Sequence, residues 1–106
     1  MNMQKMMKEA QKAQRKMAEA QEKLAALSVE GSAGGGLVTV QANGEGNITG
    51  VNIDPGTVDP EDVELLEDLV MAAVNEAQRK AKEIQEQEMS AAMGGLGGLG
   101  GLGGMF

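Results

Sequence analysis

The residues best suited to bind an anion are gathered near the N-terminus. The stretch KMMKEAQKAQRK, residues 5–16, contains a single acid, Glu9, in a chain whose formal net charge is −7. A local excess of positive charge in an acidic protein indicates an anionic partner, such as nucleic acid or a membrane surface. The five cations of this stretch are Lys5, Lys8, Lys12, Arg15 and Lys16.

A helix through this stretch would place four of the five cations on one face. On a heptad register that begins at Met3, the positions c, f, c and f are occupied by Lys5, Lys8, Lys12 and Arg15. Two acids, Glu19 and Glu22, continue the same face, so the charge is segregated by sign. A face that only keeps a helix soluble usually mixes lysine with glutamate at four-residue spacing. The segregation favours anion binding, and a solvated outer face is the alternative.

The composition counts against several anionic partners and leaves duplex DNA open. A pI of about 4.5 stands against nucleic acid in general. There is no Trp or Tyr, and the only Phe is Phe106, so the bases of a single strand would find no aromatic platform. A helix face of Met and Ala without aromatic anchors would insert only weakly into a membrane. Contacts to duplex phosphates need neither feature and carry little sequence preference. Three further cations would lie near the same tip if two long helices pair antiparallel: Arg79, Lys80 and Lys82.

The chain lacks the residues of the familiar catalytic and metal sites. It has no Cys and no His, which excludes disulfides, thiol nucleophiles, imidazole bases and the ordinary zinc ligand sets. Capping and hydration account for the acids between Asp54 and Asp62. We therefore expect no enzyme activity, no cofactor and no metal. Charged residues interrupt the N-terminal methionines, and no stretch reaches the ~20 apolar residues of a membrane span, which predicts a cytoplasmic protein.

A long helix must position the basic face. Residues 1–30 contain neither Gly nor Pro and are rich in good helix formers. Their apolar residues follow one another in alternating steps of three and four, which is the seam of a coiled coil. The seam consists of Met3, Met6, Ala10, Ala13, Met17, Ala20, Leu24 and Leu27.

Period-two alternation predicts a small antiparallel sheet in the middle of the chain. Residues 38–41 and 47–53 alternate around the turn sequence Asn-Gly-Glu-Gly, which is typical of a β-hairpin. Ile48 is out of phase with the rest of the second strand, so we expect a bulge near Gly50. The glycine-rich residues 28–36 could form a third strand, at an edge or where another backbone approaches closely.

A second long helix is predicted after the sheet. Asp59 and Pro60 fit the N-cap and the first position of a helix that continues to about Met89. The first half of this helix is apolar almost all round. Its second half keeps a thin apolar stripe, which would pack on something narrow such as the first helix.

We expect one domain, residues 1–93, followed by a flexible Gly-Gly-Leu tail, residues 94–106. The domain must build its core from aliphatic residues alone. A small core of this kind leaves a monomer marginally stable, and association into a homodimer is a common remedy.

Three motifs stand in the predicted sheet and second helix: GLVTVQANG at Gly36–Gly44, IDP at Ile53–Pro55 and LEDLVMAAVNEA at Leu66–Ala77. Together with the order of elements, they resemble the YbaB/EbfC family of bacterial nucleoid-associated proteins over essentially residues 1–93. The resemblance implies an α+β subunit of order α-β-β-β-α, with long N- and C-terminal helices and a small antiparallel sheet, in a tweezer-like homodimer. It also implies non-enzymatic binding of double-stranded DNA in the nucleoid, with effects on nucleoid organisation, gene expression or repair.

Carried over by position, the DNA-binding cations of the helix prongs would be Lys5, Lys8, Lys12, Arg15, Lys16, Arg79, Lys80 and Lys82. A second hypothesis is a protein-interaction module, in which the Met-rich seam or the cleft between prongs holds a replication or repair protein. Met adapts well to varied binding surfaces. The sequence leaves both hypotheses open.

Overall fold

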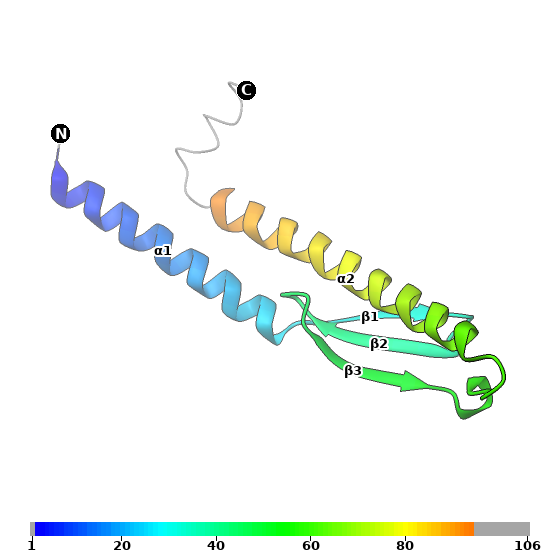
Figure 1. Cartoon of the computed structure of the whole chain (residues 1–106). Helices are drawn as coiled ribbons and strands as arrows, with labels where there is room; N and C mark the ends of the chain where they lie inside the picture. Colours follow the sequence, from blue (N-terminus) through cyan, green and yellow to red (C-terminus); the bar gives the residue numbers. More distant parts are fainter. Residues whose placement is uncertain (1, 95–106) are drawn as a thin grey trace, which may run out of the picture.

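The computed structural model describes residues 2–94 and has the element order α-β-β-β-α, which confirms the predicted α+β class (Figure 1). The elements are α1 (Met3–Ala26), β1 (Ser28–Ala33), β2 (Val38–Asn43), β3 (Ile48–Ile53), a short 3₁₀ turn (Pro55–Thr57) and α2 (Val63–Gly94). The predicted tail lies outside the described residues, apart from Gly94 at the end of α2.

Helix α1 is partnered along only part of its seam. It begins at the cap residue Asn2, whose Oδ1 accepts a hydrogen bond of 3.0 Å from the backbone N–H of Gln4. In the second half of the seam Ala20 and Leu24 are buried. Near the N-terminus Met3 and Met6 are 75% and 52% exposed. The predicted seam therefore exists, but the other described residues cover only the half nearest the sheet.

The sheet is antiparallel in the order β1-β2-β3, and α2 lies on one of its faces (Figure 1). Alternate residues of β2, namely Val38, Val40 and Ala42, are fully buried on that face. At Gly31 of β1 the helix comes very close, because an added Cβ would lie 2.3 Å from the carbonyl oxygen of Ala73. The glycine-rich third strand and its close approach to another backbone are confirmed.

A bulge in β3 brings its apolar side chains onto one face. Gln41 pairs with Gly50 and the next residue of β2, Ala42, pairs with Ile48, so Thr49 is the extra residue. Residues that pair across a ladder project to the same side of the sheet. Ile48 therefore shares the helix-facing side with the rest of the apolar set, as the predicted bulge near Gly50 requires.

Helix α2 starts later than the sequence predicts, so the expectation of Asp59 as its N-cap is wrong. Asp59 closes a turn instead: its Oδ1 accepts from the N–H of Glu61 at 2.9 Å and its carbonyl oxygen accepts from the N–H of Asp62 at 2.9 Å. Asp62 then accepts from the N–H of Leu65 at 3.3 Å. Pro60 fits the second position of a turn as well as the first position of a helix. At its other end the helix continues beyond the predicted Met89 to Gly94.

The molecule is elongated. Its radius of gyration is 20.0 Å, against ~13 Å for a compact domain of this length. Helices α1 and α2 run antiparallel and side by side beyond the sheet, and a salt bridge of 3.1 Å joins Lys23 Nζ to Glu88 Oε1 (Figure 1). The N-terminal end of α1 therefore lies at one end of the long axis, and the segment between β3 and α2 lies at the other.

Candidate nucleic-acid interface

The exposed outer face of α1 carries the predicted cations. Lys5, Lys8, Lys12 and Arg15 are all exposed, as expected for a stripe turned away from the buried seam. No acid stands in the first turn of the helix, and Lys5 in that turn faces an unfavourable helix dipole. Helix stability does not explain these cations. We call these four residues, together with the exposed Met3, Met6 and Met7, the basic tip.

Within residues 2–94, the four cations of the basic tip form no ion pair with a carboxylate within 4.0 Å. Along the helix they span ten residues, which corresponds to about 15 Å. A duplex presents a phosphate on each strand about every 3.4 Å along its axis, so a row of this length matches four to five base pairs. The side chains are long, flexible and hydrated, which suits contacts to phosphates.

Lys16 lies on the flank of the tip rather than on its outer face. It is half-buried and shares a shallow hollow with Ala20 on its own helix and with Ala91 and Ala92 on α2. The hollow lies beside the last turn of α2, which ends at Gly94. Lys16 thus stands where the paired part of the two helices gives way to the unpaired tip of α1.

The three predicted cations of α2 have different surroundings. Arg79 forms a salt bridge of 2.7 Å with Glu83. Lys80 Nζ lies 3.1 Å from Glu76 Oε1 and donates a hydrogen bond of 2.8 Å to the carbonyl oxygen of Glu30 in β1. Lys82 is exposed and forms no ion pair with the described carboxylates. Sequence reasoning missed the two pairs within α2, although their four-residue spacing is typical of helical ion pairs.

The expectation that the α2 cations lie near the basic tip is wrong for a single chain. Lys23 faces Glu88, and Lys82 is six residues from Glu88 toward the sheet, about 9 Å along the helix. Arg15, the cation of the basic tip nearest to Lys23, is eight residues from it in the opposite direction, about 12 Å. Roughly 21 Å of helix length therefore separates the two groups. Lys80 lies instead beside β1, and the α2 residues that approach α1 around Lys16 and Lys23 come from the last turns of α2.

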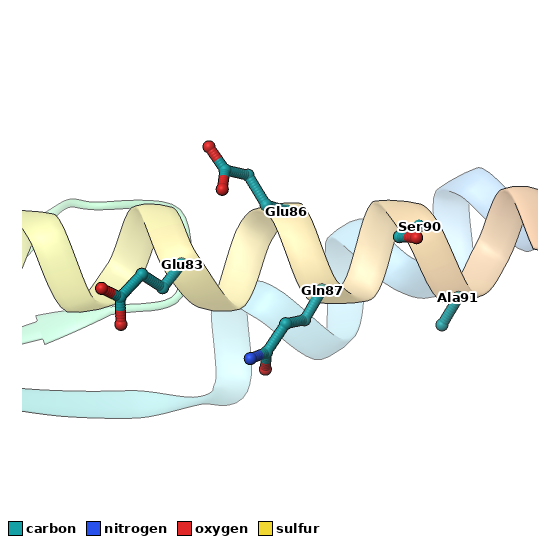
Figure 2. Close-up of a pocket in the computed structure, with 5 residues that line it drawn as sticks. All are labelled: Glu83, Glu86, Gln87, Ser90 and Ala91. Atoms are coloured by element: carbon teal, nitrogen blue, oxygen red, sulfur yellow. The ribbon is translucent and has the colours of Figure 1, made fainter. Parts of the chain in front are cut away.

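The hollow that Figure 2 shows does not add a second site. Its lining residues are Glu83, Glu86, Gln87, Ser90 and Ala91, and all five come from α2. In the close-up the two glutamates and Gln87 point in different directions from the helix rather than toward one another (Figure 2). This face is acidic, so it does not suit a polyphosphate.

Among the residues that the structure describes, no three His, Cys, Asp or Glu side chains come together in a way that could hold a metal ion. None of the described helices is long and apolar enough to cross a membrane.

Comparisons with known proteins show related sequences and a shared fold. The model of the YbaB/EbfC DNA-binding family matches residues 1–96. A nucleoid-associated protein of Chloroflexus aurantiacus is 48% identical over 95 residues, which cover 90% of this chain and 95% of that protein. One from Acetivibrio thermocellus is 54% identical over 94 residues, which cover 89% and 83%. An uncharacterized Helicobacter pylori protein of known crystal structure shares the fold, with a TM-score of 0.73 at 23% identity and coverage of 82% and 91%.

Proposed function

The chain belongs to the YbaB/EbfC DNA-binding family, a family of nucleoid-associated proteins and not of enzymes, and from this membership we propose that it binds duplex DNA as a homodimer through the basic tips of its α1 helices. The observation that carries the proposal is the row of four exposed cations, without carboxylate partners among the described residues, at one end of an acidic molecule.

The proposed contacts are to the phosphate backbone. Each Lys or Arg that neutralises a phosphate releases condensed counterions, so affinity falls as salt rises. Because phosphates carry no base identity, such contacts give limited sequence preference. Lys16 and Lys82 are proposed as secondary contacts at the margins. Arg79 and Lys80 are assigned a weaker part, because their charges are already paired with glutamates.

The homodimer is proposed from an uncovered side of the sheet. Helix α2 covers the helix-facing side of β1 and β2, but Ile48, Val51 and Ile53 of β3 remain 38–47% exposed on that side. The core beneath α2 is also small, and its largest fully buried side chains are Val38 and Val40. A second copy that covers β3 would extend this core, as small domains often require.

Placed on DNA in this way, the dimer would lie in the nucleoid and act on DNA architecture. Two basic tips on one dimer could grip one duplex or link two segments. Effects on nucleoid organisation, gene expression or repair would then follow from where the protein is bound and not from a chemical reaction.

The test is duplex affinity measured over a salt series. If each tip neutralises up to about four phosphates, the dimer should give a log–log salt slope of about −4 to −7. The triple variant Lys8→Gln, Lys12→Gln, Arg15→Gln should bind every duplex sequence more weakly and with a flatter slope, while remaining a dimer.

A matched control removes the same number of charges elsewhere: Lys23→Gln, Arg79→Gln and Lys82→Gln. Lys80 is left in place because it contacts the backbone of β1. The control should retain most of the affinity. Wild-type binding by the tip variant, or an equal loss in both variants, would show that the basic tip is not the contact surface.

A further inference from the structure

The end of the molecule opposite the basic tip carries the opposite charge. Residues 54–68 contain seven acids and no Lys or Arg. All seven acids are exposed, and the segment lies where β3 passes into α2, at the far end of the long axis (Figure 1). They are Asp54, Asp59, Glu61, Asp62, Glu64, Glu67 and Asp68.

This end also exposes an apolar patch. The side chains of Leu37 and Leu69 are neighbours, because a Cβ added at Gly34 would lie 3.3 Å from Leu37 Cδ1 and 3.0 Å from Leu69 Cδ2. Leu65 stands one turn before Leu69 on α2. Leu37 and Leu65 are 39% and 49% exposed. We call Leu37, Leu65 and the seven acids the acidic pole.

Two of the acids, Asp54 and Asp68, stand beside this patch. The backbone N–H of Asp54 donates a hydrogen bond of 2.8 Å to the carbonyl oxygen of Leu37, which fixes Asp54 beside it. Asp68 is three residues from Leu65 on the same helix, so the two side chains share a face. Exposed apolar patches that are rimmed by polar groups are typical of protein-interaction surfaces.

The basic tip has the complementary character. Its four cations occupy one face of α1, opposite the seam that carries Met3 and Met6, whereas the acidic pole combines carboxylates with exposed leucines. The two surfaces cannot meet within one chain, because they lie at opposite ends of a molecule that is 71 Å long. Any contact between them must therefore join two molecules.

We propose that the basic tip of one molecule docks on the acidic pole of a second copy, head to tail. The carboxylates take the place that phosphates would occupy, and the aliphatic stems of the tip's lysines lie over the leucines of the pole. Since the overall charge of each molecule is negative, other orientations are repulsive. A head-to-tail contact joins two different surfaces, so it extends into a chain of molecules unless the rotation between neighbours closes the chain into a ring.

The proposal goes beyond DNA binding and has a consequence for it. A tip that is docked on a pole is not available to a duplex, so DNA and self-association compete for the same cations. Both interactions are electrostatic and weaken with salt, because the Debye length falls from ~30 Å at 0.01 M to ~10 Å at 0.1 M.

Sedimentation velocity of the full chain without DNA tests the proposal. At low salt the sedimentation coefficient of the wild type should rise with protein concentration, and added salt should remove the rise. The sedimentation coefficient of the tip variant Lys8→Gln, Lys12→Gln, Arg15→Gln should not rise with concentration. The pole variant Glu61→Gln, Glu64→Gln, Asp68→Asn should also lose the rise, although removing negative charge lowers the general repulsion between molecules.

An equal mixture of the two variants should associate again, because one supplies an intact pole and the other an intact tip. A control variant, Glu22→Gln, Glu45→Gln, Glu86→Gln, removes three exposed acids outside the pole and should keep the concentration dependence. The proposal is overturned if the sedimentation coefficient of the wild type does not rise with concentration, or if it still rises in the tip variant or the pole variant. It is also overturned if the rise is lost in the control variant or does not return in the mixture.

The duplex affinity of the pole variant distinguishes a failure of the head-to-tail proposal from a failure of the proposed DNA binding. The pole variant keeps an intact basic tip, so it should bind DNA at least as well as the wild type. If the wild type does not bind duplex DNA at all, the proposed function fails while the head-to-tail contact can still be observed.

Discussion

The backbone N–H of Gly44 donates a hydrogen bond of 2.7 Å to the carbonyl oxygen of Leu24, which fastens the turn between β2 and β3 to the last turns of α1. The same N–H lies 3.1 Å from the carbonyl oxygen of Leu27. Helix ends leave carbonyl groups without partners inside the helix, and here the turn supplies a donor. The direction in which α1 leaves the sheet, and with it the position of the basic tip, depends on this contact.

Replacing Gly44 with Ala should weaken this attachment. The new Cβ would lie 2.5 Å from the Leu24 carbonyl oxygen, so the turn and the helix must move apart. We expect a loss of about 1–3 kcal/mol in the free energy of unfolding, as for other backbone clashes with loss of a hydrogen bond. Urea unfolding at fixed protein concentration measures it. Gly35→Asn, at an open position with φ of 69°, is the control and should cost less.

Replacing Gly31 with Ala should separate α2 from the sheet. An added Cβ would lie 2.3 Å from the carbonyl oxygen of Ala73 and 2.4 Å from the backbone nitrogen of Ala77, and neither backbone can yield without moving the helix. We expect a loss of about 3 kcal/mol or more in unfolding free energy. Ser32→Ala, at the next and exposed position of β1, should change it by less than about 0.5 kcal/mol. Equal melting of the two variants would contradict the packing of α2 on Gly31.

Charging the uncovered side of β3 should split the proposed dimer. Val51→Lys places an ammonium group on the helix-facing side of the strand, where a second copy would have to bury it at high cost. Asn52→Lys puts the same group on the opposite side of the same strand and serves as the matched control. Sedimentation equilibrium should find monomers for the first variant and dimers for the second. If both remain dimers, the subunits associate through another surface.

Lys80 should act on the sheet edge more than on DNA. Its ammonium group holds the carbonyl oxygen of Glu30 on β1, an edge strand whose outer backbone groups have no neighbouring strand. Lys80→Gln should speed amide hydrogen exchange in β1 and lower unfolding free energy by no more than about 1 kcal/mol. Lys82→Gln, which removes the same charge without a backbone contact, should leave exchange in β1 unchanged. If amide hydrogen exchange in β1 became faster in both variants, the cause would be the loss of charge and not the loss of the contact with Glu30.

Local pattern was enough to predict the elements of the chain. The spacing of three and four from Met3 onward is a property of the helix itself, so the seam of α1 could be found without a partner. The turn at Asn43 uses side-chain hydrogen bonds to the nearby N–H groups of Glu45 and Asn47, both at 3.0 Å. The bulge followed from the broken parity at Ile48, since strand pairing fixes which residues share a face.

The tertiary structure decided the positions that depend on distant parts of the chain. Asp59 and Asp62 both suit a helix cap, and only the turn that Asp59 closes shows that the helix starts after Asp62. Antiparallel pairing of the long helices could be expected from the sequence, but not its register. Close packing at Gly31, 46 residues before Ala77, together with the contact between Gly44 and Leu24, sets that register and leaves the tip of α1 beyond the end of α2.

The sequence by itself therefore determined the two long helices, the β-hairpin and the row of four cations on one helix face, because each depends on spacing within one segment. Only the tertiary structure separated those cations from Arg79, Lys80 and Lys82, and placed the acidic pole at the opposite end of the molecule. The physical reason is that charge along one helix face follows from helical periodicity, whereas the distance between charges on two helices follows from how far the helices overlap.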